Sequence, residues 1–144
     1  MKITNVSRHL AETWQPSDFI SHSIRPTLVI SICDDPADPL KLSPHLLQTN
    51  PTILRLYFLD IEDPTSEHAP TPAHAAHIIS ALKQAETHQQ DVLVHCTVGA
   101  NRSGTVVSFA HEYFDATTPL NLGQGDNSLL SHLLRQAVQP RARR

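Results

Sequence analysis

The 144-residue sequence predicts a single α/β domain in which a mostly parallel sheet is flanked by helices. Short apolar runs rich in β-branched residues are typical of strands that are buried on both faces of a sheet. These runs alternate along the chain with segments of helical period, which favours parallel strands covered by helices. The length is close to that of one domain and no internal repeat marks a second, so we expect residues 1–144 to form one unit.

The first part of the chain predicts two strands and little regular helix. Ile3–Val6 suits a short strand at the sheet edge. Residues 7–21 mix apolar side chains with proline and capping residues, so we expect a loop with helical turns and Trp14 in the core. Thr27–Cys33 is the apolar run of a buried strand, and the Asp and Pro content of residues 34–39 predicts a surface loop.

The middle of the chain predicts a short helix, a strand and a long helix. Residues 43–48 suit the short helix, and Thr52–Leu59 suits the strand. After a polar, proline-bearing loop, Thr71 can cap a helix that has Pro72 at its first position. Apolar residues then recur at helical spacing, so we expect this helix to end near His88.

The last part predicts one strand and two helices. Asp91 leads into a strand that ends at Cys96, and after a loop the inner face of a helix is marked by Val106, Val107, Ala110 and Phe114. Asp126 can cap a final amphipathic helix, whose apolar face consists of Leu129, Leu130, Leu133, Leu134 and Ala137. Pro140 should end that helix and leave residues 140–144 as a frayed basic tail.

Composition excludes several classes of function. A net charge of -3 gives no electrostatic reason to expect nucleic acid or an anionic membrane as the main partner. Cys33 and Cys96 do not make a disulfide framework, and a reactive thiol survives best in a reducing compartment. Residues 1–5 start no signal peptide, and no apolar run approaches membrane-spanning length. We therefore expect a soluble, cytoplasmic protein.

The stretch from Val92 to Gly104 carries the chemistry. A strand, a tight loop and a helix start follow one another, so backbone N–H groups converge on the hollow of the loop and the helix dipole adds positive potential. Cys96 and Arg102 close the two ends of this loop. A thiolate at one end is stabilised by this environment, and a guanidinium at the other matches two phosphate oxygens. A nucleophile and a phosphate clamp thus share one loop.

The pattern His95-Cys96-(x)5-Arg102-Ser103 is similar to the signature loop of cysteine-dependent protein tyrosine and dual-specificity phosphatases. The resemblance covers most of the chain in the order of elements, and it is specific from about residue 54 to 114. It implies a compact dual-specificity-like catalytic domain that needs no cofactor and no metal. It also implies that Cys96 attacks phosphorus and that Ser103 hydrogen-bonds the sulfur when it leaves. Phosphate would be bound by Thr97, Val98, Gly99, Ala100, Asn101 and Arg102.

In the resembled family an Asp protonates the leaving group, and two residues here are eligible. Asp63 lies 33 positions before Cys96 and fits the usual spacing better. Asp60 lies 36 positions before it, at the predicted end of the Thr52–Leu59 strand, where the family places its acid. The Asp-Ile-(x)2-Pro pattern starting at Asp60 is also similar to that of small bacterial members. We favour Asp60, and we expect Asp63 to be a solvated turn residue.

Other polar residues have simpler roles. His95 should orient the loop rather than transfer protons, and Asn101 should brace the phosphate loop or the acid loop. His74 and His77 share a helix face, but no third ligand is close in sequence, so we expect a solvated face rather than a metal site. Cys33, at the end of a strand, should be a buried structural thiol rather than a redox partner of Cys96.

The substrate is less constrained. Phosphotyrosine in proteins, with phosphoserine or phosphothreonine, is the default that the resemblance implies. Residues 97, 98, 100 and 101 of the loop are uncharged, whereas phosphoinositide phosphatases of this superfamily tend to carry lysines there. An RNA 5′-phosphatase would want a basic surface. A phosphate-binding pseudo-enzyme and a Cys-based arsenate reductase or sulfurtransferase remain as alternatives.

Overall fold

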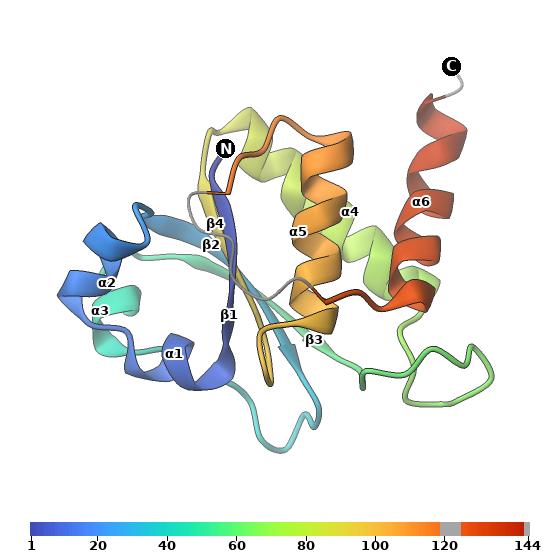
Figure 1. Ribbon diagram of the computed structural model, residues 1–144, viewed down its shortest axis with the longest axis horizontal. Helices are drawn as coiled ribbons and strands as arrows, with labels where there is room; N and C mark the ends of the chain where they lie inside the picture. Colours follow the sequence, from blue (N-terminus) through green and yellow to red (C-terminus); the bar gives the residue numbers. More distant parts are fainter. Residues whose placement is uncertain (119–124, 143–144) are drawn as a thin grey trace.

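The computed structural model describes residues 1–118 and 125–142. Its sheet has four strands, all parallel, in the order β1-β4-β2-β3 (Figure 1). The strands are β1 (Ile3–Ser7), β2 (Pro26–Cys33), β3 (Thr52–Tyr57) and β4 (Asp91–Cys96). The helices are α1 (Arg8–Thr13), α2 (Pro16–Ser21), α3 (Pro44–Leu47), α4 (Pro72–Thr87), α5 (Asn101–Tyr113) and α6 (Ser128–Ala142). The predicted α/β domain with a parallel sheet is confirmed.

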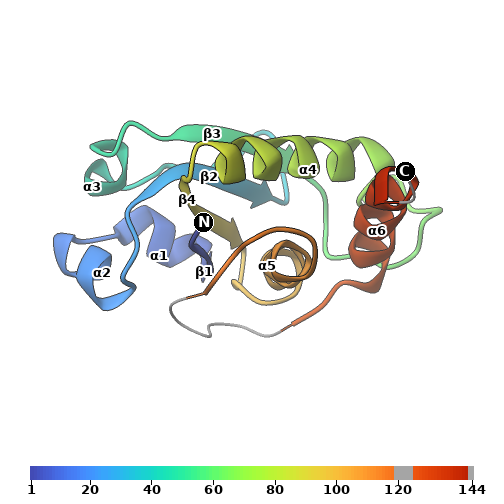
Figure 2. The same ribbon diagram turned by 90° about the horizontal axis from the view of Figure 1, so that it is seen from above.

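Helices cover both faces of the sheet. Seen from above, α4, α5 and α6 lie on one side, and the short helices α1, α2 and α3 lie on the other (Figure 2). Alternate residues of β2 supply the two cores: Ile30 and Ile32 pack toward α4 and α5, whereas Val29 and Cys33 pack with the fully buried Trp14. This alternation follows from the period of two in a strand, and it explains why both faces of β2 are mostly apolar.

Three of the boundaries that differ from the sequence prediction are described here, and two of them affect the site. β3 ends at Tyr57 rather than Leu59, because the backbone N–H of Leu59 turns away to the carbonyl of His68 at 2.8 Å. The N-cap of α6 is Asn127 rather than Asp126, since the Asn127 side chain accepts from the N–H of Leu130 at 2.9 Å.

The third difference lies at the other end of α6. The helix runs two residues beyond Pro140, to Ala142, instead of ending there. Of the expected tail, residues 143 and 144 lie outside the described residues. No helix within residues 1–118 and 125–142 combines the length and the apolar character needed to cross a bilayer.

Candidate active site

The carboxyl ends of β2, β3 and β4 meet at one edge of the sheet, where open parallel sheets bind their ligands. β4 ends at Cys96, and α5 begins at Asn101, so residues 97–100 form a tight connection. Cys96 is 2% exposed, and its Sγ lies 3.2 Å from the Oγ of the fully buried Ser103 in the first turn of α5. The structure therefore brings the predicted nucleophile and the predicted leaving-group partner into direct contact.

Gly99 allows this loop to lie against β1. Its φ of +78° falls in the left-handed region, which favours glycine. A Cβ at this position would lie 2.5 Å from the backbone of Val6 and Ser7, so even the smallest side chain would push the loop away from the strand. Asn5 of β1, which is also buried, donates from Nδ2 to the Gly99 carbonyl at 2.8 Å and to Ser103 Oγ at 3.5 Å. Asn5 was not identified from the sequence, where it reads as a polar residue in an edge strand.

The Arg102 side chain turns back from α5 toward the sheet edge and is 5% exposed. Its Nη1 donates to the Phe58 carbonyl at 2.7 Å and to Asp34 Oδ1 at 2.6 Å. Its Nη2 donates to Thr97 Oγ1, within the phosphate loop, at 3.1 Å. Arg102 thus lies at the loop as the spacing predicts, and Asp34 is a partner that the sequence reading treated as part of a plain surface loop.

The two candidate acids lie in different surroundings. Asp60 accepts from the Nδ2 of Asn101, the first residue of α5, and from the Nδ2 of Asn127, each at 2.8 Å. Asp63 folds back on its own turn, where the backbone N–H and the hydroxyl of Thr65 both donate to its Oδ1 and lower the pKa of its carboxyl. Only Asp60 is linked to the phosphate loop.

Asn127 is a second residue that sequence reasoning missed. It is fully buried, and besides bonding Asp60 its Nδ2 donates to the carbonyl of Ile61 at 3.2 Å. The next residue, Ser128, donates from its N–H and its hydroxyl to Glu62, which lowers the pKa of that carboxyl. The start of α6 therefore holds residues 60–62. In the sequence these two residues are recognisable only as a polar pair before an apolar helix. That pattern does not indicate which loop they contact.

His95 faces away from Cys96. Its Nε2 lies 2.6 Å from the Oγ of Ser31, its partner across the β2–β4 ladder, and Cys33 Sγ lies 3.7 Å from the same hydroxyl. Burial lowers the pKa of the His95 imidazole from 6.5 to about 4, so it is neutral at pH 7. Cys33 and Cys96 belong to the cores on opposite faces of the sheet, which separates the two thiols.

His74 takes part in the N-terminal cap of α4. Its Nδ1 accepts from the N–H of Thr71, which completes a capping box, and its ring packs on Phe58 with centroids 4.8 Å apart. Burial, with a contribution from His77, lowers the pKa of this imidazole. The described ranges contain no group of three or more His, Cys, Asp or Glu placed to hold a metal ion.

The comparisons with known proteins agree with this geometry. The protein-tyrosine phosphatase family model matches residues 63–118, which span α4, β4, the loop and α5 but not Asp60. Among curated proteins, none matches the sequence.

Solved structures show the same fold at low identity. The human tyrosine phosphatase-like serine/threonine/tyrosine-interacting protein superposes with a TM-score of 0.65 at 16% identity, over 97% of this chain and 93% of its own. PTPMT1 superposes with a TM-score of 0.59 at 17% identity, over 99% of this chain and 96% of its own. It is also solved in complex with PI(5)P. A mouse putative dual specificity phosphatase complexed with zinc tungstate superposes with a TM-score of 0.55 at 20% identity, over 94% of this chain and 83% of its own.

The family model and the fold likeness overlap at the candidate site. The signature loop lies inside the segment that the family model matches, and the fold extends the likeness over 94% or more of the chain. This chain is thus similar to protein-tyrosine phosphatases over residues 63–118, and it has the fold of the solved phosphatase-like structures over nearly its whole length.

Proposed function

We propose that this protein hydrolyses phosphate monoesters, above all phosphotyrosine in proteins, through a cysteinyl-phosphate intermediate. The observation that carries the proposal is the 3.2 Å contact between Cys96 and Ser103 in the loop that also holds the buried Arg102. Phosphoserine and phosphothreonine are further substrates for the same chemistry.

In the first step the Cys96 thiolate attacks phosphorus, and an S–P bond forms as the ester P–O bond breaks. Arg102 and the backbone N–H groups of residues 97–102 stabilise the charge on the three non-bridging oxygens. Asp60 gives its proton to the leaving oxygen, which departs as the free phenol or alcohol. Asp60 is preferred to Asp63 because Asn101 connects it to the loop.

In the second step water attacks the same phosphorus and gives a proton to the Asp60 carboxylate. The S–P bond breaks, its electron pair returns to the sulfur of Cys96, and inorganic phosphate leaves. The Ser103 hydroxyl donates to the departing thiolate, which their separation of 3.2 Å allows. Asp60 is then protonated again and ready for the next substrate.

The charges around the loop favour a substrate with one phosphate. Residues 97–101 carry no charge, and the Arg102 guanidinium already faces Asp34. Arg8, whose N–H donates to the Thr97 carbonyl, is ion-paired with Glu12 and Asp38. A phosphoinositide or an RNA 5′-end would bring further negative charge with no spare cation from these residues to meet it.

The rim of the loop suits a peptide. Val98 is 77% exposed, and it lines a groove of about 280 Å³ with Leu10, Val6 and Gly99. An apolar side chain next to a phosphotyrosine could bury surface there.

The test is hydrolysis of an aryl phosphate in the presence of a metal chelator and a reductant. Wild-type protein should turn over, and Cys96→Ser should lose turnover while it still binds vanadate, because a hydroxyl without a nearby base cannot replace the thiolate. Vanadate binding without turnover in the wild type would instead identify a phosphate-binding pseudo-enzyme. A phosphopeptide panel run against a phosphoinositide panel then decides the substrate class.

A second experiment distinguishes the phosphatase from an enzyme with thiol redox chemistry. An arsenate reductase needs a resolving thiol, and Cys33 packs in the core on the opposite face of the sheet from Cys96. Arsenate-dependent disulfide formation between these two residues would contradict the phosphatase proposal.

A further inference from the structure

The contacts of Arg102 divide its guanidinium into an occupied end and a free edge. Nη1 has two N–H groups, and the Phe58 carbonyl and Asp34 Oδ1 accept one each. Nη2 donates to Thr97 Oγ1, and that hydroxyl lies 3.4 Å from the same Asp34 oxygen. Thr97 and Asp34 therefore both contact the side of the guanidinium where Nη1 and Nη2 are neighbours. Within residues 1–118 and 125–142, no group accepts from Nε.

The free edge has the geometry that phosphate recognition requires. The Nε–H and the remaining Nη2–H are parallel donors, and this pair makes the two-pronged contact with two oxygens of a phosphate. A long side chain that is held at its far end can present this edge without further ordering when the ligand arrives.

We propose that Asp34 is a positioning residue for Arg102: it fixes the Nη1 end of the guanidinium so that the Nε edge faces the phosphate. This inference rests on the proposed function, because it gives Asp34 a role only where Arg102 binds an oxyanion. Asp34 itself does not touch substrate. It also offsets the charge of a guanidinium that is almost fully buried.

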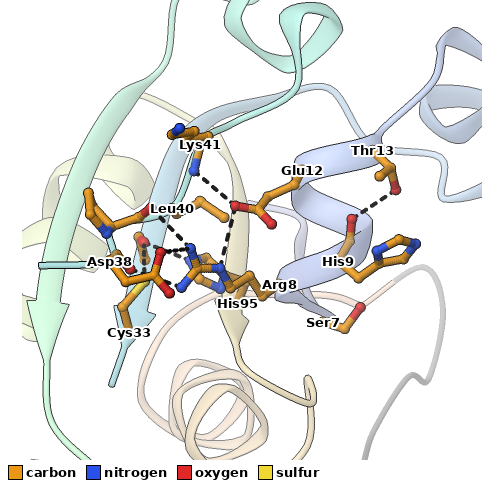
Figure 3. A network of polar contacts seen from close by, with 12 residues as sticks. Ser7, Arg8, His9, Glu12, Thr13, Cys33, Asp38, Leu40, Lys41 and His95 are labelled. Atoms are coloured by element: carbon orange, nitrogen blue, oxygen red, sulfur yellow. Dashed lines mark hydrogen bonds and ion pairs between the residues drawn. The ribbon is translucent and has the colours of Figure 1, made fainter. Parts of the chain in front are cut away.

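Besides Arg102 and Thr97, Arg8 connects the loop that carries Asp34 to the phosphate loop, and Figure 3 shows Arg8 beside Asp38 of the former loop. Arg8 follows β1 directly, and its backbone N–H donates to the Thr97 carbonyl at 3.3 Å. Its Nη1 donates to the Asp38 carbonyl at 2.9 Å, and its Nη2 donates to Asp38 Oδ1 at 3.0 Å and to the Pro39 carbonyl at 3.1 Å. Arg8 thus contacts both the loop of Asp34 and the loop of Cys96.

Glu12 strengthens this connection. It lies one turn after Arg8 on α1, and its Oε2 accepts from Arg8 Nε at 3.4 Å and from the backbone N–H of Lys41 at 3.2 Å. The Arg8 side chain is 22% exposed, so its pairing with Glu12 and Asp38 is partly shielded from solvent.

The test compares Asp34→Ala, Asp34→Asn and Asp34→Glu with Asp35→Asn as the matched control. Asp35 is the next residue, and its carboxylate accepts only from the N–H of Ala37 among the described residues. Asp34→Ala should weaken vanadate binding and lower kcat/KM about 10- to 100-fold, the worth of one hydrogen bond to a charged group. Asp34→Asn should lose less, Asp34→Glu should recover part of the loss, and Asp35→Asn should stay within twofold of wild type.

A double-mutant cycle separates positioning from general damage to the fold. In an Arg102→Lys background, Asp34→Ala should have little further effect on vanadate binding, because the fork that it orients is gone. Arg8→Ala should weaken vanadate binding less than Asp34→Ala does. Additive losses in the cycle, or vanadate binding that is unchanged or tighter in Asp34→Ala, would overturn the inference; the tighter case would make Asp34 a competitor of phosphate.

Vanadate binding also keeps this inference distinct from the proposed function. If the wild type binds vanadate but hydrolyses no phosphate ester, the enzymatic proposal fails. In that case weaker vanadate binding by Asp34→Ala would still support the positioning role. Urea denaturation of every variant identifies any that lose stability rather than orientation.

Discussion

The phosphate loop and the acid loop are built in opposite ways. The phosphate loop holds Cys96, Gly99, Arg102 and Ser103 within eight consecutive residues, and β1 supports it directly. The acid loop leaves β3 at Tyr57 and reaches α4 at Pro72. Its candidate acid, Asp60, is held by Asn101 and Asn127, which lie 41 and 67 positions away in the sequence. The residues proposed for attack on phosphorus are therefore close together in sequence, whereas those proposed for proton transfer come from three separate segments.

This difference means that nucleophilic attack and proton transfer should respond differently to substitution. A change in the phosphate loop should affect every substrate, because every substrate must be held and attacked there. A change that releases Asp60 should matter only when the leaving group needs a proton. Leaving-group dependence is therefore the measurement that distinguishes the two regions.

The most general effect, a loss for every substrate, is expected at the phosphate loop. Arg102→Lys should lower kcat/KM about 10³-fold for all substrates, because an ammonium is a point charge and cannot make the two-pronged contact. Steady-state kinetics with an aryl phosphate and a phosphopeptide measures it. Arg135→Lys, at an exposed ion pair with Glu112, is the matched control and should change neither rate more than twofold. A loss confined to the phosphopeptide would contradict the assignment of Arg102 to phosphate binding.

The acid loop should show the opposite pattern. Asp60→Asn should lower the rate for a phosphopeptide about 10²- to 10⁴-fold and should matter much less for an aryl phosphate with a good leaving group. Asp63→Asn should do little, because hydrogen bonds from Thr65 keep that carboxyl ionised and occupied within its own turn. If Asp63→Asn shows the leaving-group-dependent loss instead, the acid is Asp63.

The same contrast explains what the sequence could predict. Strand burial, the Gly turn and the helix start are local, so β4, the phosphate loop and α5 follow from residues 91–113 alone. Asp34 and Asn127 act through contacts with Arg102 and Asp60, each more than 60 positions distant, and no local pattern encodes such a pairing. The end of β3 was missed for a related reason, since the partner of Leu59 is His68 on the acid loop.

His95 gives a prediction at the base of the phosphate loop. Its pKa is about 4 in the fold and about 6.5 when unfolded, so between these values the unfolded chain binds the extra proton. The free energy of unfolding is therefore not reduced by His95 above pH 6.5. It decreases as the pH falls from 6.5 toward 4, because the proton binds to the unfolded chain. The loss between pH 7 and 4.5 should amount to about 2 to 3 kcal/mol.

Urea denaturation at the two pH values measures this loss. His95→Gln should remove about that much of the pH dependence, whereas substitution of the exposed His132 by Gln should leave it unchanged. An equal pH dependence in wild type and His95→Gln would show that His95 is not held neutral in the fold.

The smallest effect is expected at Asn127, and it tests the difference between the phosphate loop and the acid loop most directly. This residue caps α6 through Oδ1 and holds Asp60 through Nδ2, so Asn127→Ala removes both functions at once. Asn127→Ser keeps a cap but loses the amide donor. Both variants should lower the phosphopeptide rate about 10- to 100-fold, the worth of one hydrogen bond to a charged group, and leave the aryl phosphate rate nearly unchanged. Only Asn127→Ala should also lose about 1 kcal/mol of stability. If Asn127→Ser retains the full phosphopeptide rate, Asn127 serves α6 alone and Asn101 suffices to hold the acid.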